Sequence, residues 1–494
     1  MNADTRSDRR RWLALYVLCT GMLMIVLDAT VVNVALPTIQ TDLGFSQSNL
    51  AWVVNAYLIA FGGLLLLAGR LGDLIGQRRV FLIGLTIFTV ASLVCATVDS
   101  QGLLIGARFI QGIGGALTSA VILGMIVTMF PERREQAKAI GVFTFVASAG
   151  GSIGLLAGGV ITQTINWHWI FFINLPIGIA TGLLARRLVD AREGIGLRAG
   201  ADVPGAALLT AGLMLGVYNI LEVPNHGWGA TQTLVLGAVS LLLIAAFVVR
   251  QARIPNPLMP LRLFRSRNVA GANVVQALMV AGMFGMFFLG ALYMQKILGY
   301  DALEVGLAFL PATIVMGTMS IGLSERLIMR FGPRRTLLPG VALIGIGLLW
   351  FARTPVDGSY VTDLLPAMLL IGLGIGSAGP SLVTLAMSGA TQSDSGLASG
   401  LVNTSLQVGG AIGLAVLATL AAQKTSSALA SGASHAAALN SGYHLAYLIG
   451  AGLLAIALTV AITVLRSPEP VSAETLAEEE RDRASAEAAY FEAA

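Results

Sequence analysis

Residues 12–36 read WLALYVLCTGMLMIVLDATVVNVAL, an apolar run with no lysine or arginine and a single acidic residue, Asp28. A helix needs about 20 such residues to cross the hydrocarbon core of a membrane. Barrel strands would instead alternate polar and apolar residues over about ten positions. The run is too long for a signal peptide and carries no small-residue cleavage pattern. We therefore expect it to form an uncleaved membrane-spanning helix.

Similar runs recur along the whole chain. Of its 494 residues 56% are hydrophobic and 11% charged, too few charges to cover the surface of soluble domains, which carry about 25%. Because only helices and closed barrels satisfy the backbone in lipid, the sequence predicts an all-α integral membrane protein. The 14 predicted transmembrane helices lie at about residues 12–36, 50–69, 79–99, 102–130, 137–162, 169–189, 203–223, 232–249, 268–296, 304–324, 336–352, 363–385, 396–421 and 443–465.

The basic residues are distributed asymmetrically between the connecting segments. If both termini are cytoplasmic, 26 of the 30 lysines and arginines lie on the cytoplasmic side, and only Lys296, Arg353 and Lys424 lie outside. Arg108 falls within the fourth span. This bias follows the positive-inside rule, so it fixes the orientation and accounts for the pI without nucleic-acid binding. The acidic segment 467–494 has no apolar stripe and is expected to be a disordered cytoplasmic tail.

Several functional classes are disfavoured by what the sequence lacks. The two cysteines, Cys19 and Cys95, lie in apolar runs, and the four histidines are scattered, so neither a disulfide framework nor a metal site is expected. The chain has no G-x-x-x-x-G-K-[ST] motif, which argues against an ATP-driven pump. No set of nucleophile, base and acid is found, so an enzyme is not expected.

Three short patterns recur at an offset of 256–260 residues and define an internal repeat. They pair Gly76 with Gly332, Gly112 with Gly372, and Gly150 with Gly409. The offset equates spans 2–5 with spans 10–13, so two parallel six-helix bundles flank two inserted helices. The predicted divisions are residues 1–196, 197–262, 263–466 and the tail 467–494. Parallel halves with substrate at their interface are typical of transporters that work by rocking.

The sequence resembles the major facilitator superfamily and, within it, the fourteen-span drug:proton antiporters, over about residues 10–466. The resemblance rests on Leu27-Asp28-x-Thr30-Val31-Val32-Asn33-Val34-Ala35-Leu36-Pro37, Gly69-x-Leu71-x-Asp73-x-x-Gly76-x-Arg78-Arg79, Arg108-x-x-Gln111-Gly112-x-Gly114, Gly141 with Gly150-x-x-x-Gly154-Leu155-x-x-Gly158-Gly159, and Trp167-His168-Trp169-x-Phe171-x-x-Asn174-x-Pro176. The chain departs from the family pattern at Leu155, where proline is usual, and at His168, where arginine is common.

This resemblance implies a multi-pass cell-membrane transporter that acts as a monomer, takes no cofactor and uses the proton gradient as its energy source. It would export amphipathic, often cationic, molecules in exchange for protons, which is the activity of multidrug efflux and antibiotic resistance proteins. Two alternatives stay open: a proton-coupled symporter or uniporter of a polar metabolite, and a non-transporting membrane receptor or lipid-handling scaffold.

Asp28, Arg108 and Glu222 are the candidate proton-coupling residues. A carboxylate at the depth of Asp28 costs at least about 2.5 kcal/mol when unpaired, and low dielectric favours its neutral form. A nearby cation reverses that preference, so Asp28 holds either a proton or a cationic substrate. Arg108 lies at similar depth, and a fixed ion pair with Asp28 is the alternative role. Glu222, near the outer end of the seventh span, is either a second proton site or an interface residue.

Two further groups of residues have candidate roles in conformational change. The loop after the second span is similar to a conformational latch, formed by Gly69, Arg70, Asp73, Gly76, Arg78 and Arg79; in the second half Met329 replaces Asp73, so topology alone does not explain this acid. In the fifth span, small residues permit close helix packing or a hinge: Gly141, Gly150, Gly154, Gly158 and Gly159.

The ninth span is the repeat equivalent of the first, so one of its faces is expected to line the central cavity. Met and Phe side chains form an adaptable wall, and aromatic rings suit cationic substrates. The predicted substrate-binding residues in this span are Gln276, Met279, Met283, Phe284 and Phe287, with Tyr57, Gln111, Phe145, Asn403 and Gln407 in other spans.

Overall fold

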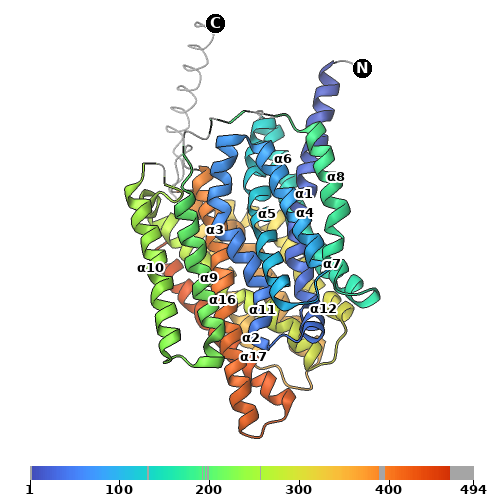
Figure 1. Cartoon of the computed structure of the whole chain (residues 1–494), viewed down its shortest axis with the longest axis vertical. Coiled ribbons are helices and arrows are strands. Elements are labelled where there is room, and N and C mark those ends of the chain that lie inside the picture. The colour runs from blue at the N-terminus through green and yellow to red at the C-terminus, as the bar shows by residue number, and fades with distance from the viewer. Residues whose placement is uncertain are drawn as a thin grey trace.

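The computed structural model describes residues 3–467 except 131–132, 192, 195, 197–199, 256 and 389–394. All secondary-structure elements of the described residues are helices, and these residues contain no β-strand. Apart from Ser467, the predicted acidic tail lies outside the described residues. The helices run mostly along one axis of the molecule (Figure 1).

The helices fall into three consecutive groups. The first comprises α1 (Ala3–Leu43), α2 (Gln47–Leu50), α3 (Trp52–Ile75), α4 (Gln77–Cys95), α5 (Gln101–Met129), α6 (Arg133–Thr164), α7 (Trp169–Phe172) and α8 (Asn174–Leu188). The second is the hairpin of α9 (Val203–His226) and α10 (Thr231–Arg253). The third comprises η2 (Leu261–Arg265), α11 (Arg267–Lys296), α12 (Ala302–Thr318), η3 (Met319–Leu323), α13 (Ser324–Phe331), α14 (Pro333–Phe351), η4 (Tyr360–Leu364), α15 (Leu365–Met387), α16 (Ser395–Ala430) and α17 (His435–Thr463).

Twelve helices of the described residues are long and apolar enough to cross a membrane. Two shorter apolar helices, Ile153–Thr164 and Ala302–Thr318, lie where the fifth and tenth spans are predicted. The tenth is shortened because a π-helical turn, η3, interrupts it after Thr318. The chain is therefore a multi-pass membrane protein with about a dozen spans.

The glycines that carry the sequence repeat make equivalent contacts in the two halves. A Cβ at Gly112 of α5 would lie 2.5 Å from the carbonyl oxygen of Tyr57 in α3, and a Cβ at Gly372 of α15 would lie 2.5 Å from that of Ala312 in α12. Gly114 and Gly374 likewise press against the backbones of α4 and α14. A side chain at any of these positions would push two helices apart, so the glycines set how closely the helices pack.

The two halves meet along repeat-related seams, where α6 packs against α12 and α3 against α16. A third contact joins the C-terminal ends of α1 and α11. Gln295 Nε2 donates to the carbonyl oxygen of Val34 at 3.0 Å, and Lys296 Nζ to Thr41 Oγ1 at 3.4 Å. Two hydrogen bonds thus link α1 to α11 at this end of the molecule.

The hairpin of α9 and α10 contacts both halves, because α9 packs against α3 and α16. Pro224 lacks an N–H group, so the helix leaves the carbonyl of Ile220 without its usual donor. Thr419 Oγ1 of α16 donates to that carbonyl at 3.0 Å. Trp228 Nε1 adds a second bond to Gln423 at 3.4 Å. The inserted hairpin is therefore attached to the second half through polar contacts.

The opposite end of the hairpin is held by Asp202, which caps α9 and is buried. Its carboxylate accepts from Arg250 Nε and from Gln251 Nε2, both at 2.6 Å, and from the backbone N–H of Gly205 at 2.9 Å. Burial acts to raise the pKa of Asp202, but these hydrogen bonds outweigh it and lower the pKa below its ordinary value of 3.8.

Asp202→Asn is expected to lower the free energy of unfolding by about 1–2 kcal/mol at neutral pH, because it removes charge-assisted hydrogen bonds. A lowered pKa means that the stabilisation is complete above the ordinary value and is lost as the pH falls through the folded value. Unfolding in detergent should therefore separate the two proteins at pH 7 and bring them together progressively as the pH falls below 3.8. A difference that persists unchanged in acid would contradict this account.

Candidate functional site

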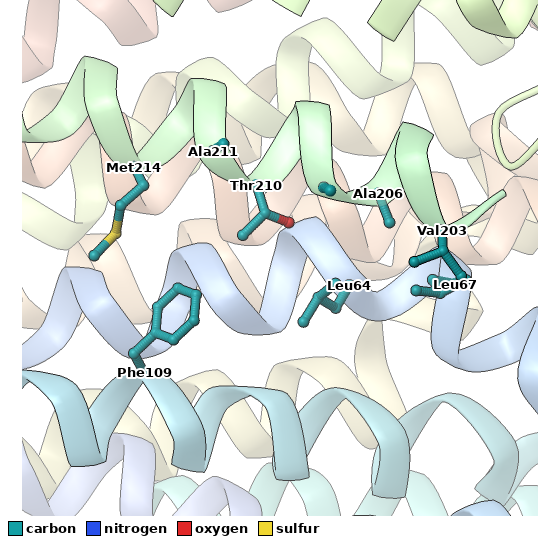
Figure 2. A pocket seen from close by; sticks show the side chains of 9 residues that line it. Leu64, Leu67, Phe109, Val203, Ala206, Thr210, Ala211 and Met214 are labelled. Carbon is teal, nitrogen blue, oxygen red and sulfur yellow. The ribbon is translucent and has the colours of Figure 1, made fainter. Parts of the chain in front are cut away.

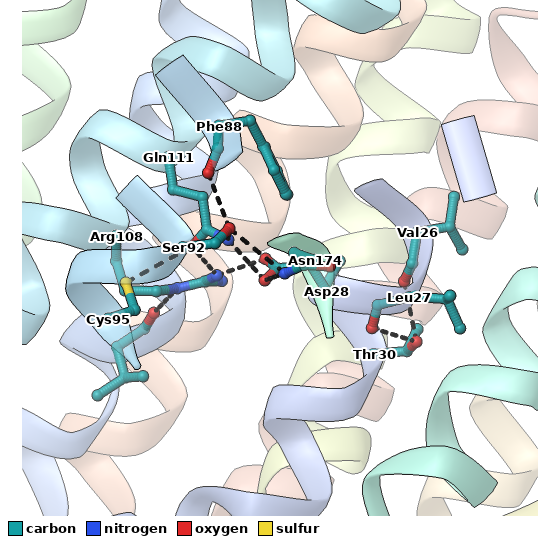
Figure 3. Close-up of polar contacts among 12 residues, drawn as sticks. Val26, Leu27, Asp28, Thr30, Phe88, Ser92, Cys95, Arg108, Gln111 and Asn174 are labelled. Atoms are coloured by element: carbon teal, nitrogen blue, oxygen red, sulfur yellow. Dashed lines mark hydrogen bonds and ion pairs between the residues drawn. The ribbon is translucent and has the colours of Figure 1, made fainter. Parts of the chain in front are cut away.

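Asp28 lies near the middle of α1 and is 2% exposed, with Arg108 of α5 beside it at 1%. Five helices surround this pair: α1, α3, α4, α5 and α8. Figure 3 shows the side chains of Arg108, Gln111, Ser92 and Asn174 gathered around Asp28. All of them are buried in the first half of the chain.

Three side chains donate hydrogen bonds to the Asp28 carboxylate. Arg108 Nη1 contacts Oδ2 at 2.5 Å. Gln111 Nε2 and Asn174 Nδ2 both donate to Oδ1, at 2.7 and 3.0 Å. An arrangement of donors alone suits the ionised carboxylate, because a protonated carboxyl must also donate.

The guanidinium of Arg108 is held on several sides. Its Nε donates to the carbonyl oxygen of Val53 at 3.0 Å, and its Nη1 also reaches Gln111 Oε1 at 2.7 Å. The rings of Tyr57 and Phe171 lie 4.5 and 5.7 Å from its central carbon. Cation–π contact adds to the stabilisation of a desolvated cation.

Close helix packing creates this cluster. Gly112 and Gly114 bring α5 against α3 and α4, which places Arg108 and Gln111, one turn apart, on the face toward α1. The hydroxyl of Ser92 accepts from Gln111 Nε2 at 2.8 Å and donates to the carbonyl of Phe88 at 2.8 Å. Cys95 adds a weak contact to Gln111 Oε1 at 3.8 Å. The polar groups thus form one connected network in an apolar surrounding.

A buried ion pair of this kind adds little net stability, but the loss of either charge is strongly destabilising. Removing one partner leaves an uncompensated buried charge, which costs about 3–5 kcal/mol. Protonation of Asp28 has the same electrostatic effect on Arg108 as removing the carboxylate charge. A change in the charge of this one carboxyl would therefore act on a network that joins five helices.

The third predicted proton-coupling residue lies elsewhere. Glu222 is half-buried near the end of α9, where Asn225 Nδ2 donates to it at 2.9 Å and the His226 ring lies 3.7 Å away. Its contacts are local to α9 and do not include the Asp28 cluster.

Two of the predicted latch residues, Arg78 and Arg70, contact α8 and the segment that follows it. Arg78 Nη2 donates to the carbonyl of Arg186 at 2.9 Å, at the C-terminal end of α8, and Arg70 Nε to that of Gly200 at 3.3 Å. Gly76 ends α3 with φ +96°, a conformation that favours glycine, and its repeat partner Gly332 has φ +84°. Asp73 and Arg79 are exposed, and Gly69 lies open to its surroundings.

The glycines of α6 pack against α1 beside the acidic residue. Gly150 faces Leu23 and Val26, Gly154 faces Thr30, and Gly158 faces Val31, while Gly159 faces Ala302 of α12. The side-chain position of Gly141 lies outside the described residues. These contacts are those of tightly packed helices.

The predicted substrate-binding residues separate into two sets. Tyr57 and Gln111 belong to the Asp28 cluster, and Gln276 and Met279 are buried in α11. The residues that remain at least partly exposed are Met283, Phe284, Phe287, Asn403 and Gln407. Phe284 packs on Gly410 of α16 and Phe287 on Phe309 of α12. The side chain of Phe145 lies outside the described residues.

A separate cavity of about 350 Å³ lies between α3, α5 and α9 (Figure 2). Its lining is apolar except for Thr210, whose buried hydroxyl has no partner among the described residues. The other lining residues are Leu64, Leu67, Phe109, Val203, Ala206, Ala207, Ala211 and Met214. None of the residues predicted to bind substrate lines it.

Sequence reasoning missed Asn174 and Ser92 as members of the cluster. Asn174 belongs to the motif around residues 167–176, but nothing in that motif shows that it faces Asp28. The only signal in the sequence was that each is a neutral polar residue within a predicted span. The depth of a residue in the membrane does not show which helices lie next to each other.

The chain matches the Major Facilitator Superfamily over residues 18–414, and it belongs to that family. It is therefore a membrane transporter and not an enzyme. Among curated proteins it is 40% identical to the cephamycin export protein CmcT of Amycolatopsis lactamdurans, over 85% of this chain and 87% of that one. It is 37% identical to the puromycin resistance protein pur8 of Streptomyces alboniger, over 95% and 94%.

A third relative, the tetracenomycin C resistance and export protein of Streptomyces glaucescens, is 34% identical over 84% of this chain and 77% of its own length. Among solved structures, a bacterial homolog of the human lysosomal transporter Spinster, inward-facing and unoccupied, superposes with a TM-score of 0.67. That likeness covers 93% of this chain and 99% of the other at 15% identity, and it shows the shared fold. The relatives are thus antibiotic export and resistance transporters of one family.

Proposed function

We propose that this protein exports amphipathic small molecules of the antibiotic class in exchange for protons, and that Asp28 carries the coupling proton. The observation that carries the proposal is the fully buried Asp28–Arg108 pair, in which Asp28 accepts hydrogen bonds from three side chains on two other helices, α5 and α8. Ionisable residues inside a membrane are expensive, and they commonly mark proton or substrate pathways. The names of the related exporters favour export over uptake of a polar metabolite.

The proposed topology has 14 spans with both termini in the cytoplasm. It is supported by the twelve long apolar helices, by the two shorter ones at the predicted fifth and tenth positions, and by the bias of basic residues. Residues 1–196 and 263–466 would form the two moving halves, with residues 197–262 as the inserted hairpin. The equivalent glycine contacts of the two halves support this division.

Substrate would bind between the halves, where the partly exposed Met283, Phe284 and Phe287 of α11 offer an adaptable apolar wall. The protein would work as a monomer without a cofactor, driven by the proton gradient. Alternating access would require the contacts of Gln295 and Lys296 with α1 to open and re-form in each cycle.

Transport in everted vesicles with separately imposed pH and voltage gradients tests this proposal. If Asp28 alone carries the coupling, exchange of one monovalent cation for one proton moves no net charge. The membrane potential, worth about 2.3 kcal/mol per charge per 100 mV, then contributes nothing. A pH difference contributes about 1.36 kcal/mol per unit, which sustains about a tenfold gradient of substrate.

We therefore expect export of ethidium, a monovalent amphipathic cation, to respond to pH and hardly to voltage. Strong stimulation by a cytoplasm-negative potential at zero pH difference would exclude the single-carboxylate version. Glu222→Gln is the matched variant: if it removes such stimulation, Glu222 is a second proton site. No pH response with any of ethidium, puromycin or a cephamycin would contradict proton exchange.

A further inference from the structure

The contacts of Asp28 raise a question about its protonated form. In the structure every neighbour donates to the carboxylate: Arg108, Gln111 and Asn174. A proton carrier must also be stable when it holds the proton, and its O–H group then needs an acceptor. A buried O–H group without an acceptor costs about 1–3 kcal/mol.

Most acceptors near Asp28 are already occupied. Gln111 Oε1 accepts from Arg108 Nη1 at 2.7 Å and from Cys95. The carbonyl of Val53 accepts from Arg108 Nε at 3.0 Å. Ser92 Oγ accepts from Gln111 Nε2 at 2.8 Å. Gln111 cannot exchange its two ends, because its amide nitrogen would then face the guanidinium.

Two side-chain oxygens of the cluster lack a hydrogen-bond partner within the described part of the chain, Asn174 Oδ1 and Tyr57 Oη, and of these two residues only Asn174 is hydrogen-bonded to Asp28. Asn174 is the first residue of α8 and is fully buried. Its Nδ2 donates to Asp28 Oδ1 at 3.0 Å and reaches Ser92 Oγ at 3.4 Å. A half-turn about the terminal bond of the side chain would present the oxygen to Asp28 in place of the nitrogen (Figure 3).

We propose that Asn174 is a positioning residue that follows the charge state of Asp28. Its amide nitrogen donates to the ionised carboxylate, and after a half-turn its oxygen accepts the O–H of the protonated one. The proton comes from water on the side to which the site opens, bonds to Asp28 Oδ1, and leaves to water on the other side. This inference rests on the proposed function, in which Asp28 carries the proton.

The other titratable groups that face Asp28 from the surrounding helices do not provide this switch. Arg108 has only donors. Cys95 of α4 already contacts Gln111. The hydroxyl of Tyr57 in α3 also lacks a partner among the described residues, but its ring lies over Arg108 and no hydrogen bond joins it to Asp28. Among the contacts of the described residues, α6 meets α1 through glycines and α8 meets Asp28 through Asn174, neither of which is ionisable. In both orientations the far end of the Asn174 amide lacks a partner, so the contact with Asp28 and the longer contact with Ser92 Oγ decide between them.

Asn174→Leu is expected to slow pH-driven net export about tenfold, because the protonated carboxyl loses its acceptor. Counterflow exchange of labelled for unlabelled substrate at equal pH needs no proton transfer, so it should stay within about twofold of wild type. Asn174→Thr supplies a hydroxyl that donates or accepts, and it should restore most of the net rate.

Asn440→Leu is the matched control. Asn440 is also buried, donates to the carbonyl of Thr354 at 2.8 Å, and has an unpartnered Oδ1 among the described residues, but it belongs to α17. The Asn440→Leu variant should leave the ratio of net export to counterflow unchanged. If Asn440→Leu lowered the ratio of net export to counterflow as much as Asn174→Leu does, the proposal would be overturned.

Infrared difference spectra across a pH titration give a readout that packing does not move. In wild type, the side-chain carbonyl stretch of Asn174, identified by its loss in Asn174→Thr, should shift to lower frequency when Asp28 is protonated. Asp28→Asn should abolish the shift. If the Asn174 amide keeps one orientation and only donates, the frequency of its carbonyl stretch does not change when Asp28 is protonated. That result would overturn the proposal.

The two proposals fail in different ways. If Asp28→Asn retains pH-driven export, the proton-carrier role is wrong whatever Asn174 does. If Asp28→Asn loses it while Asn174→Leu lowers neither rate or lowers both equally, the coupling role of Asn174 alone is wrong.

Discussion

Asp28→Asn is expected to reduce pH-driven export to the rate of vesicles that lack the protein. The asparagine side chain keeps the size and an oxygen that accepts from Arg108, but it cannot bind and release a proton. The protein should stay folded, because Arg108 keeps the carbonyl of Val53, Gln111 Oε1 and two aromatic rings. Efflux of a preloaded substrate along its own gradient is expected to continue, since it needs no proton.

Asp202→Asn is a suitable control, because Asp202 is also a buried acid in an ion pair but lies at the start of α9. Its variant should export at a normal rate per folded molecule. Both proteins would be measured with ethidium and puromycin, with the amount of folded transporter determined by gel filtration. Normal pH-driven export by Asp28→Asn would remove Asp28 from the mechanism.

Arg108→Leu is expected to have the largest effect on stability. It leaves Asp28 buried without a cation, and breaking a buried pair in this way costs about 3–5 kcal/mol. Export should be lost as well. Adding Asp28→Asn to this variant removes the uncompensated charge, so the double variant should regain much of the stability and none of the pH-driven export.

The measurement is fluorescence-monitored unfolding in detergent for wild type, the two single variants and the double variant. A large positive coupling between the two sites is the expected outcome. Simple addition of the two losses would show that Arg108 acts through Val53 and the aromatic rings rather than through Asp28. Arg108→Lys should be intermediate, because lysine keeps the charge but not the planar set of donors.

The helical class and the positions of the spans could be predicted because both depend on composition along the chain. Apolar runs such as residues 12–36 require no tertiary information. The tenth span was harder, because a π-helical turn at Met319–Leu323 interrupts a run that looks continuous in the sequence. The orientation and the full count of spans stay predictions.

The Asp28–Arg108 pair could be predicted because charges within apolar runs are rare and their depths can be compared. Gln111 was predicted to contact substrate, but in the structure it bonds to Asp28, Arg108 and Ser92. The role of Asn174 could not be foreseen, because it depends on which faces of α1 and α8 meet. Periodicity gives the face of a helix, but not its neighbour.

All the charge of the coupling cluster belongs to helices that precede residue 190. At the offset of 260 residues that relates Gly112 to Gly372, Arg108 corresponds to Met368 and Gln111 to Ile371, both buried and apolar. The buried charged pair therefore belongs to one copy of the repeat, and the positions equivalent to Arg108 and Gln111 in the other copy are apolar. Under the proposed mechanism, substitutions in the second half can change the surface presented to a substrate without altering the charged pair, so one scaffold could serve the export of chemically unrelated compounds.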